Sequence, residues 1–204
     1  MRRKVKHICA IFIITTCLLA SLSGCNSGTD LSTSEKGTSE EVQQASDVVE
    51  EMQQSLEFST RDIEGETYTQ DMFADYDLTM VNVFATWCSP CIREIPDLQK
   101  LRDEMADQGV NVVGIVLDGV DISGNVDEEA VEKAKILAEE TGAVYPFLIP
   151  DEEYLNGILF DVEAVPKTFF VDKNGNIVGE SYTGSRSLED WKEIVESELK
   201  GITQ

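Results

Sequence analysis

Histidine and basic side chains are scarce in this sequence, and their scarcity narrows its function before any motif is considered. The 204 residues include a single histidine, His7, and 16 Lys and Arg against 39 Asp and Glu, a net charge of −23. A surface that negative repels the phosphates of nucleic acids and the head groups of anionic lipids. We therefore expect no nucleic-acid partner and no electrostatic attachment to a membrane.

Residues 1–24 have the composition of a secretory signal peptide. Basic residues between positions 2 and 6 precede an apolar run at 8–20, which is shorter than the roughly 20 residues that cross a bilayer. The segment runs into Leu22-Ser23-Gly24-Cys25, which resembles the lipobox of bacterial lipoproteins, where the cysteine is acylated and becomes the first residue. We predict a lipid anchor at Cys25. The alternative is a plain signal or anchor helix with an incidental cysteine.

Removal of this leader would leave few side chains that can act as nucleophiles or metal ligands. It would take away four of the 16 basic residues and none of the 39 acidic ones, so 12 would remain and the net charge would be −27. It would also remove His7 and two of the five cysteines, while lipid would occupy Cys25. Cys88 and Cys91 would be the remaining thiols. Without histidine, Ser-His-Asp and Cys-His nucleophiles and histidine-bound metals are excluded.

A polar segment, residues 25–57, separates the leader from the rest of the chain. It is rich in Ser, Thr, Gly, Glu and Gln and buries too little apolar surface to order itself as a domain. Its second half places Val42, Ala45, Val49 and Met52 near helical spacing. We predict a flexible acidic tether with an amphipathic helix that acts as a spacer. A partner-binding helix is the alternative.

Residues 58–204 have the length of one domain. Apolar and β-branched runs predict buried strands, and helical spacing predicts helices. The expected strands are 78–84, 110–117, 167–171 and 177–182, the expected helices are 90–108, 127–141 and 188–200, and a short hairpin is expected within 58–69. Asn174-Gly175 marks a hairpin turn, and Pro96 predicts a kink. This order predicts an α/β fold: a central mixed β-sheet with helices on both faces and an N-terminal β-hairpin extension.

The segment Trp87-Cys88-Ser89-Pro90-Cys91 lies where a buried strand gives way to a helix. Two intervening residues put both sulfurs on the first helical turn, within disulfide reach. Cys88 is expected at the exposed end, where unpaired backbone N–H groups and the helix dipole favour its thiolate, which is the nucleophile. Cys91, one turn deeper, can attack a mixed disulfide at Cys88. The motif therefore predicts a redox-active disulfide.

A Cys-x-x-Cys pair has three other known uses in proteins. Half of a zinc site needs two further Cys or His ligands, which the mature chain lacks. An inert structural disulfide would close a loop too short to stabilise the fold much. A peroxidatic cysteine, as in peroxiredoxins, would require Thr or Ser where Ala85 stands. We favour the redox dithiol and expect no metal and no other cofactor.

Two separated motifs resemble the thioredoxin-like branch that contains the TlpA and ResA proteins. The first, at 81–96, reads VNVFATWCSPCIREIP, and the second, at 162–172, reads VEAVPKTFFVD. The resemblance covers about residues 58–199. It implies a thioredoxin-like fold with a cis peptide bond between Val165 and Pro166, packed against the dithiol. It also implies that the backbone of Val165 pairs with an extended substrate segment.

Glu94 follows Cys91 by three residues, where the ResA-like pattern has a carboxylate that exchanges protons with the dithiol. Burial raises the pKa of a carboxyl group, which suits an acid–base partner near neutral pH; an ordinary exposed helix glutamate is the alternative. Asn82 stands where most thioredoxins have a buried aspartate, which leaves Glu94 as the candidate for proton transfer. We expect Trp87 to be half-exposed beside Cys88 and to help dock the substrate.

The resemblance also implies an insertion, which residues 118–141 fit. Residues 145–147 would then line the approach to Cys88, although core packing explains them equally well.

The resemblance implies that the protein is a thiol–disulfide oxidoreductase. We expect it at the extracytoplasmic face of the cell membrane, held there by its lipid anchor alone. We expect a monomer that takes electrons from a membrane thiol donor and passes them to a protein disulfide, in apocytochrome c, a methionine sulfoxide reductase or another oxidised protein. A disulfide-forming oxidase would use the same cysteines in reverse. A non-catalytic surface-binding lipoprotein would use the fold only as a scaffold.

Overall fold

The computed structural model describes residues 58–151, 157–160 and 162–202. The predicted signal peptide, the tether with its helix, and Cys25 lie outside the described residues. Within the described part of the chain, no helix is both long enough and apolar enough to span a membrane.

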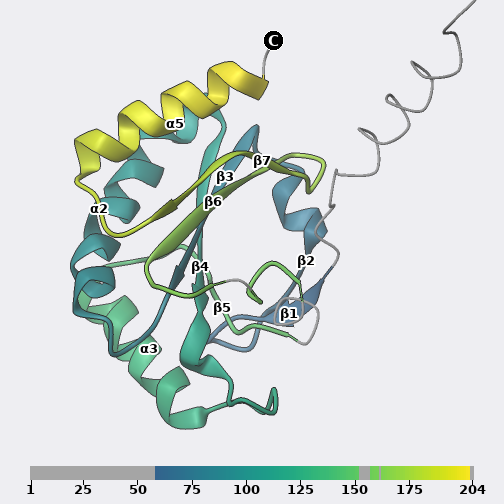
Figure 1. The fold of residues 1–204 in the computed structure, drawn as a ribbon, viewed down its shortest axis with the longest axis vertical. Coiled ribbons are helices and arrows are strands. Elements are labelled where there is room, and N and C mark those ends of the chain that lie inside the picture. Colours follow the sequence, from purple (N-terminus) through teal and green to yellow (C-terminus); the bar gives the residue numbers. More distant parts are fainter. Residues whose placement is uncertain (1–57, 152–156, 161, 203–204) are drawn as a thin grey trace, which may run out of the picture. The chain divides into compact units, whose positions relative to one another are not determined.

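A five-stranded mixed sheet forms the centre of the domain (Figure 1). Its strands lie in the order β5-β4-β3-β6-β7. They are β3 (Leu78–Phe84), β4 (Val110–Val116), β5 (Phe147–Leu148), β6 (Lys167–Asp172) and β7 (Ile177–Thr183). β3 runs parallel to β4 and antiparallel to β6, β4 runs parallel to β5, and β6 runs antiparallel to β7. The predicted α/β class and mixed sheet are confirmed.

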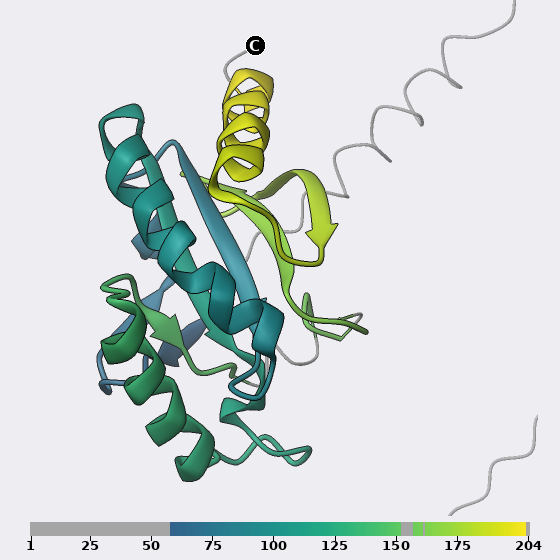
Figure 2. The same ribbon diagram turned by 90° about the vertical axis from the view of Figure 1, so that its left-hand side faces the viewer.

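Three long helices pack against one face of this sheet: α2 (Ser89–Met105), α3 (Glu128–Thr141) and α5 (Leu188–Ile202) (Figures 1 and 2). Leu98, Ala134 and Trp191, one from each helix, belong to a single buried apolar cluster. The parallel connections β3-α2-β4 and β4-α3-β5 step across the sheet in the same direction. Because such crossovers are right-handed, both place their helices on the same face.

The opposite face of the sheet is covered as well. Among the described residues, it carries the 3-10 helix η1 (Gln70–Phe73) and the segment around Leu159. Phe73 is fully buried there against Val81 and Val113. Both faces of β3 and β4 are therefore covered, and every residue of these two strands is buried.

The predicted N-terminal hairpin is present as β1 (Ser59–Arg61) and β2 (Thr67–Thr69), which pair antiparallel. Its turn docks beside β5. The Ile63 N–H donates to the Phe147 carbonyl at 2.9 Å, and the Ile149 N–H donates to the Arg61 carbonyl at 2.8 Å. The hairpin thus covers a sheet edge whose backbone groups would otherwise be unpaired.

Capping residues define the ends of α3. Asp127 caps α3 by accepting hydrogen bonds from the backbone of Glu129 and Ala130, and Gly142 ends the helix with a left-handed φ of 72°. α2 includes Pro96 and continues beyond it to Met105. Two further 3-10 turns, η2 (Ala106–Gln108) and η3 (Leu117–Gly119), flank β4.

Candidate active site

The two cysteines lie at the start of α2, directly after β3. Cys88 caps the helix, and its sulfur accepts a hydrogen bond from the Cys91 N–H at 3.3 Å. The Ile92 N–H donates to the Cys88 carbonyl at 3.0 Å. The two sulfurs form a disulfide, with Cα atoms 5.3 Å apart. The predicted proximity of the sulfurs on the first helical turn is confirmed, and the backbone N–H of Cys91 points at the sulfur that would carry negative charge after reduction.

The residues of the Trp87–Cys91 motif differ in how much of their surface is exposed to solvent. Cys91 is 1% exposed and Cys88 is 5% exposed, so in the disulfide form both are buried. Trp87, expected to be half-exposed, is 71% exposed. An approaching polypeptide would therefore meet the indole of Trp87 first and would reach Cys88 before Cys91.

The second motif meets the first at the disulfide. The peptide bond between Val165 and Pro166 is cis, as the resemblance implied. The Val165 carbonyl oxygen lies 3.7 Å from the Cys88 sulfur. Pro166 is buried and Val165 is partly buried. The loop before β6 thus lies against the sulfur of the more exposed cysteine.

Glu94 is buried, with 2% of its surface exposed, on the face of α2 that packs into the domain. One carboxylate oxygen accepts hydrogen bonds from the Arg186 N–H at 2.7 Å and the Trp191 indole N–H at 2.8 Å. The other oxygen faces the Asn82 amide at 3.4 Å. Cys91 precedes Glu94 by three residues on the same helix, a spacing that makes side chains neighbours. The expectation of a buried Glu94, rather than an exposed one, is met.

Burial raises the pKa of Glu94, because the ionised carboxylate loses its hydration. The hydrogen bonds from Arg186, Trp191 and Asn82, together with the guanidinium charge of Arg186, favour the ionised form and oppose that shift. Desolvation is the larger effect, so the pKa remains above its ordinary value. A carboxyl group in this state can gain or lose a proton nearer to neutral pH than a solvated one.

Arg186 and Trp191 are site residues that the sequence did not reveal. The Arg186 guanidinium lies 5.0 Å from the ring centres of both Tyr182 and Trp191, and it donates to the Gly184 carbonyl at 2.8 Å. These residues reach Glu94 across sequence separations of 92 and 97 residues. The available signals were weak: Trp191 is one of two tryptophans, and Arg186 stands in an acidic C-terminal region.

Within the segment 145–147, Tyr145 and Phe147 belong to the apolar core. Tyr145 and Phe147 are 4% and 1% exposed and pack edge to face, with ring centres 5.2 Å apart. Burial raises the pKa of the Tyr145 hydroxyl, and the charge of Glu94 raises it further. The core-packing alternative therefore describes Tyr145 and Phe147 better than a role in lining the approach to Cys88.

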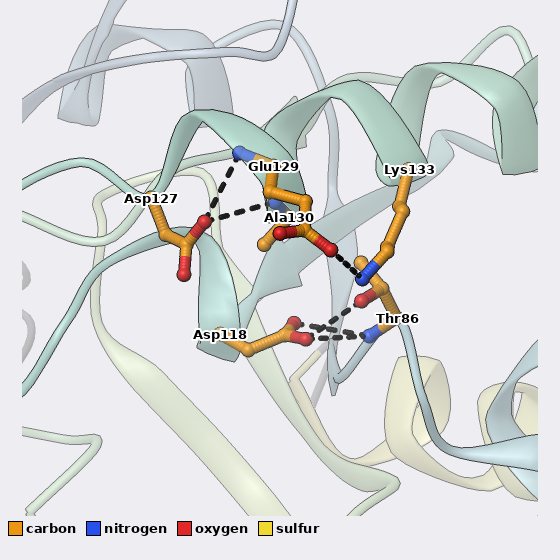
Figure 3. A network of polar contacts seen from close by, with 6 residues as sticks. All are labelled: Thr86, Asp118, Asp127, Glu129, Ala130 and Lys133. Carbon is orange, nitrogen blue, oxygen red and sulfur yellow. Dashed lines mark hydrogen bonds and ion pairs between the residues drawn. The ribbon is translucent and has the colours of Figure 1, made fainter.

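A surface hollow of about 440 Å³ adjoins Trp87. Trp87 and Thr86 form one side, Asp118 stands between, and Asp127, Glu129 and Lys133 contribute from the start of α3. Figure 3 shows how Asp118 points to Thr86 while Lys133 pairs with Glu129 at 2.7 Å. Within the described residues, no group of three or more His, Cys, Asp or Glu side chains is placed to hold a metal ion.

Comparisons with known proteins agree with this geometry. A profile of the AhpC/TSA family matches residues 52–179. The thiol-disulfide oxidoreductase ResA of Geobacillus thermodenitrificans (strain NG80-2) is 34% identical over 118 residues, which cover 57% of this chain and 60% of that protein. The thioredoxin-like protein YneN of Bacillus subtilis (strain 168) is 27% identical over 146 residues, 71% of this chain and 78% of that protein.

A solved structure gives the same result for the fold. The crystal structure of a thiol:disulfide interchange protein of the thioredoxin family from Chlorobium tepidum TLS superposes with a TM-score of 0.59 at 26% identity, covering 72% of this chain and 97% of that one. The Cys-x-x-Cys pair at the start of α2, the mixed sheet and the matched profile therefore lead to one assignment: the chain belongs to the AhpC/TSA family and has a thioredoxin-like fold.

Proposed function

We propose that this protein is a thiol–disulfide oxidoreductase whose working group is the Cys88–Cys91 pair, and that it acts as a reductant of protein disulfides. The observation that carries the proposal is the disulfide at the start of α2, beside the exposed Trp87 and in contact with the Val165 carbonyl. The ResA protein and the interchange protein that it resembles are both named for thiol–disulfide exchange.

In the reduced protein, the Cys88 thiolate attacks one sulfur of the substrate disulfide. A bond forms between Cys88 and that sulfur, and the other substrate sulfur leaves as a thiolate. Cys91 then loses its proton and attacks the Cys88 sulfur, which forms the Cys88–Cys91 disulfide and releases the second substrate thiolate. Two electrons pass to the substrate, and the two protons of the dithiol balance the two thiols that the substrate gains.

In these reaction steps, Glu94 acts as the proton acceptor for Cys91. It lies on the same face of α2, and its pKa is raised by burial. The hydrogen bonds from Arg186 and Trp191 hold one carboxylate oxygen in place, which leaves the carboxylate oriented by the fold rather than by solvent. Trp87 and the backbone of Val165 would contact the substrate on either side of Cys88.

The direction of electron flow is the part of the proposal that needs its own measurement. The protein is equilibrated with glutathione or dithiothreitol buffers of known potential, and the fraction of the Cys88–Cys91 disulfide is determined by alkylation. We expect a midpoint potential near about −250 mV or lower, in the range of reducing thioredoxins. A midpoint near the roughly −120 mV of strong oxidants would contradict a reductant and would support a disulfide-forming oxidase.

The site of action is proposed from the sequence alone. Acylation of Cys25 would hold the domain at the extracytoplasmic face of the membrane, where a membrane thiol donor would reduce the Cys88–Cys91 disulfide again. We expect wild type to sediment with membranes and to incorporate a labelled fatty acid, while Cys25→Ala does neither and keeps its redox activity. Equal membrane fractions for the two proteins would exclude a lipid anchor at this cysteine.

A further inference from the structure

The turn that carries Trp87 and Cys88 is tied to the neighbouring strand by one carboxylate. Asp118, in η3, accepts the Thr86 N–H at 3.0 and 3.2 Å with its two oxygens. One of those oxygens also accepts the Thr86 hydroxyl at 2.7 Å. All three contacts converge on the residue two places before Cys88 (Figure 3).

These contacts continue the register of the sheet after its backbone ladder has ended. The last pair of β3 and β4 joins Phe84 to Val116, and Thr86 and Asp118 each lie two residues further along. The Cys88 N–H donates to the Ala85 carbonyl at 3.0 Å, which closes a four-residue turn with Thr86 and Trp87 in its middle. The side chain of Asp118 therefore fixes this turn to the end of β4, where no strand pairing holds it.

The turn is also where substrate would arrive. Trp87, the residue before Cys88, is 71% exposed on it, and Thr86, Trp87 and Asp118 together line the surface hollow that adjoins Trp87. A charge-assisted pair of hydrogen bonds to a partly buried carboxylate is stronger than a neutral one. Besides the Cys88–Cys91 disulfide, the hydrogen bonds between Thr86 and Asp118 therefore attach the Trp87 turn to the rest of the domain.

We propose that Asp118 is a positioning residue for disulfide exchange: by holding Thr86, it fixes the orientation in which Trp87 and the Cys88 sulfur meet a protein disulfide. This inference rests on the proposed oxidoreductase function. Attack on a disulfide needs the nucleophile in line with the sulfur–sulfur bond, and a small misplacement of a reacting group lowers the rate steeply. Asp118 acts through Thr86 and takes no part in the bond changes.

Two substitutions separate position from charge. Asp118→Asn keeps an acceptor oxygen and the shape of the side chain but removes the negative charge, whereas Asp118→Ala removes the hydrogen bonds as well. The full-length chain is assayed for reduction of insulin disulfides and, separately, of the small disulfide 5,5′-dithiobis(2-nitrobenzoate). We expect Asp118→Ala to slow insulin reduction about tenfold and the small disulfide much less, while Asp118→Asn stays within about threefold of wild type.

Substitutions of Thr86, the hydrogen-bond partner of Asp118, test the same contact from its other side. Thr86→Ser keeps the hydroxyl and should behave as wild type, whereas Thr86→Val loses it and should slow insulin reduction. Combined with Asp118→Ala, Thr86→Val should add little further loss, because both changes remove the same contact. If Asp118→Ala does not fold, the Ser and Val variants carry the comparison alone. Urea midpoints of all variants show what fraction is folded under assay conditions.

Several results would overturn the inference. Equal losses in Asp118→Asn and Asp118→Ala would contradict the expectation that an acceptor oxygen of the right shape is enough to hold Thr86. Wild-type rates in Asp118→Ala would mean that the turn needs no such anchor, and equal losses with both disulfides, or losses explained by unfolding, would mean a purely structural role. If wild type itself reduces no disulfide, the proposed function fails and the inference with it; if wild type is active, failure concerns Asp118 alone.

Discussion

Replacing Cys88 by Ala is expected to abolish disulfide exchange, lowering the rate of insulin reduction by on the order of 10³ or more, as removal of a covalent nucleophile does in other enzymes. Replacing Cys91 by Ala is expected to have a different outcome. The first attack by Cys88 still occurs, but the mixed disulfide with the substrate is then not resolved and accumulates. The difference follows from the roles proposed for the two cysteines, since Cys88 makes the first attack and Cys91 resolves the mixed disulfide.

Insulin turbidity with dithiothreitol as the electron source measures the first variant, and mass spectrometry of the alkylated, non-reduced protein measures the second. Cys25→Ala serves as the matched control, because it removes a cysteine that the proposal places outside the redox site. Ser89→Ala tests the spacer between the two sulfurs. Both controls are expected to stay near wild type.

Three outcomes would change the interpretation. Insulin reduction that persists in Cys88→Ala would support the scaffold reading, in which the fold only binds a partner. Full turnover by Cys91→Ala would mean that one thiol and a second substrate thiol suffice. Consumption of hydrogen peroxide that depends on Cys88 would favour a peroxidase, against the sequence argument from Ala85.

The central strands and the helix ends were predictable because their signals are local. β3 at Leu78–Phe84 has the predicted bounds, since a run of apolar and β-branched residues between polar loops needs no distant partner to define it. The end of α3 at Gly142 and the turn at Gly175 depend on left-handed backbone, with φ of 72° and 81°, which glycine adopts at little cost. The hairpin β1–β2 was expected for similar reasons.

Features that depend on distant contacts were missed. β5 consists of two residues, Phe147 and Leu148, too few to show a periodic pattern, and it exists because β4 and the hairpin turn supply its hydrogen bonds. The placement of α2 and α3 on the same face follows from the strand order, which the sequence does not display. Knowing that β5 lies next to β4 would have fixed the face of α3 through crossover handedness.

In the candidate site, too, local features were predictable and contacts between distant residues were not. Cys88, Cys91 and Glu94 are spaced along one helix, so sequence alone placed them together. Arg186 and Trp191 reach Glu94 from the far end of the chain. Trp191 is buried and its indole N–H donates to Glu94, a contact that helical periodicity does not reveal.

Glu94→Gln is expected to move the alkylation profile of the reduced dithiol to lower pH by about one unit, within the range that a nearby like charge produces. In wild type, an ionised Glu94 beside the dithiol opposes a second negative charge on sulfur, and the two groups titrate as a coupled pair. Glutamine is nearly isosteric and can still accept the hydrogen bonds of Arg186 and Trp191. Iodoacetamide rates measured across the thiol titration test this, and identical profiles for the two proteins would rule out the proton-transfer role.

The same substitution should change stability with a definite sign. Because burial raises the pKa of Glu94 above its ordinary value of 4.5, the folded protein binds this proton more tightly than the unfolded chain does. Wild-type stability is therefore lost as pH rises from about 4.5 through the folded pKa. Glu94→Gln does not titrate, so its free energy of unfolding relative to wild type should increase over that interval and then level off.

Urea unfolding of the oxidised proteins at several pH values measures this difference, and subtraction of the two curves cancels the titration of the other acidic residues. Glu132→Gln, which changes an exposed glutamate of α3, is the matched control and should give a flat difference. A flat difference for Glu94→Gln as well would mean that its hydrogen bonds offset the loss of hydration. Glu94 would then ionise like a surface carboxylate, and it could not hold a proton for Cys91 near neutral pH.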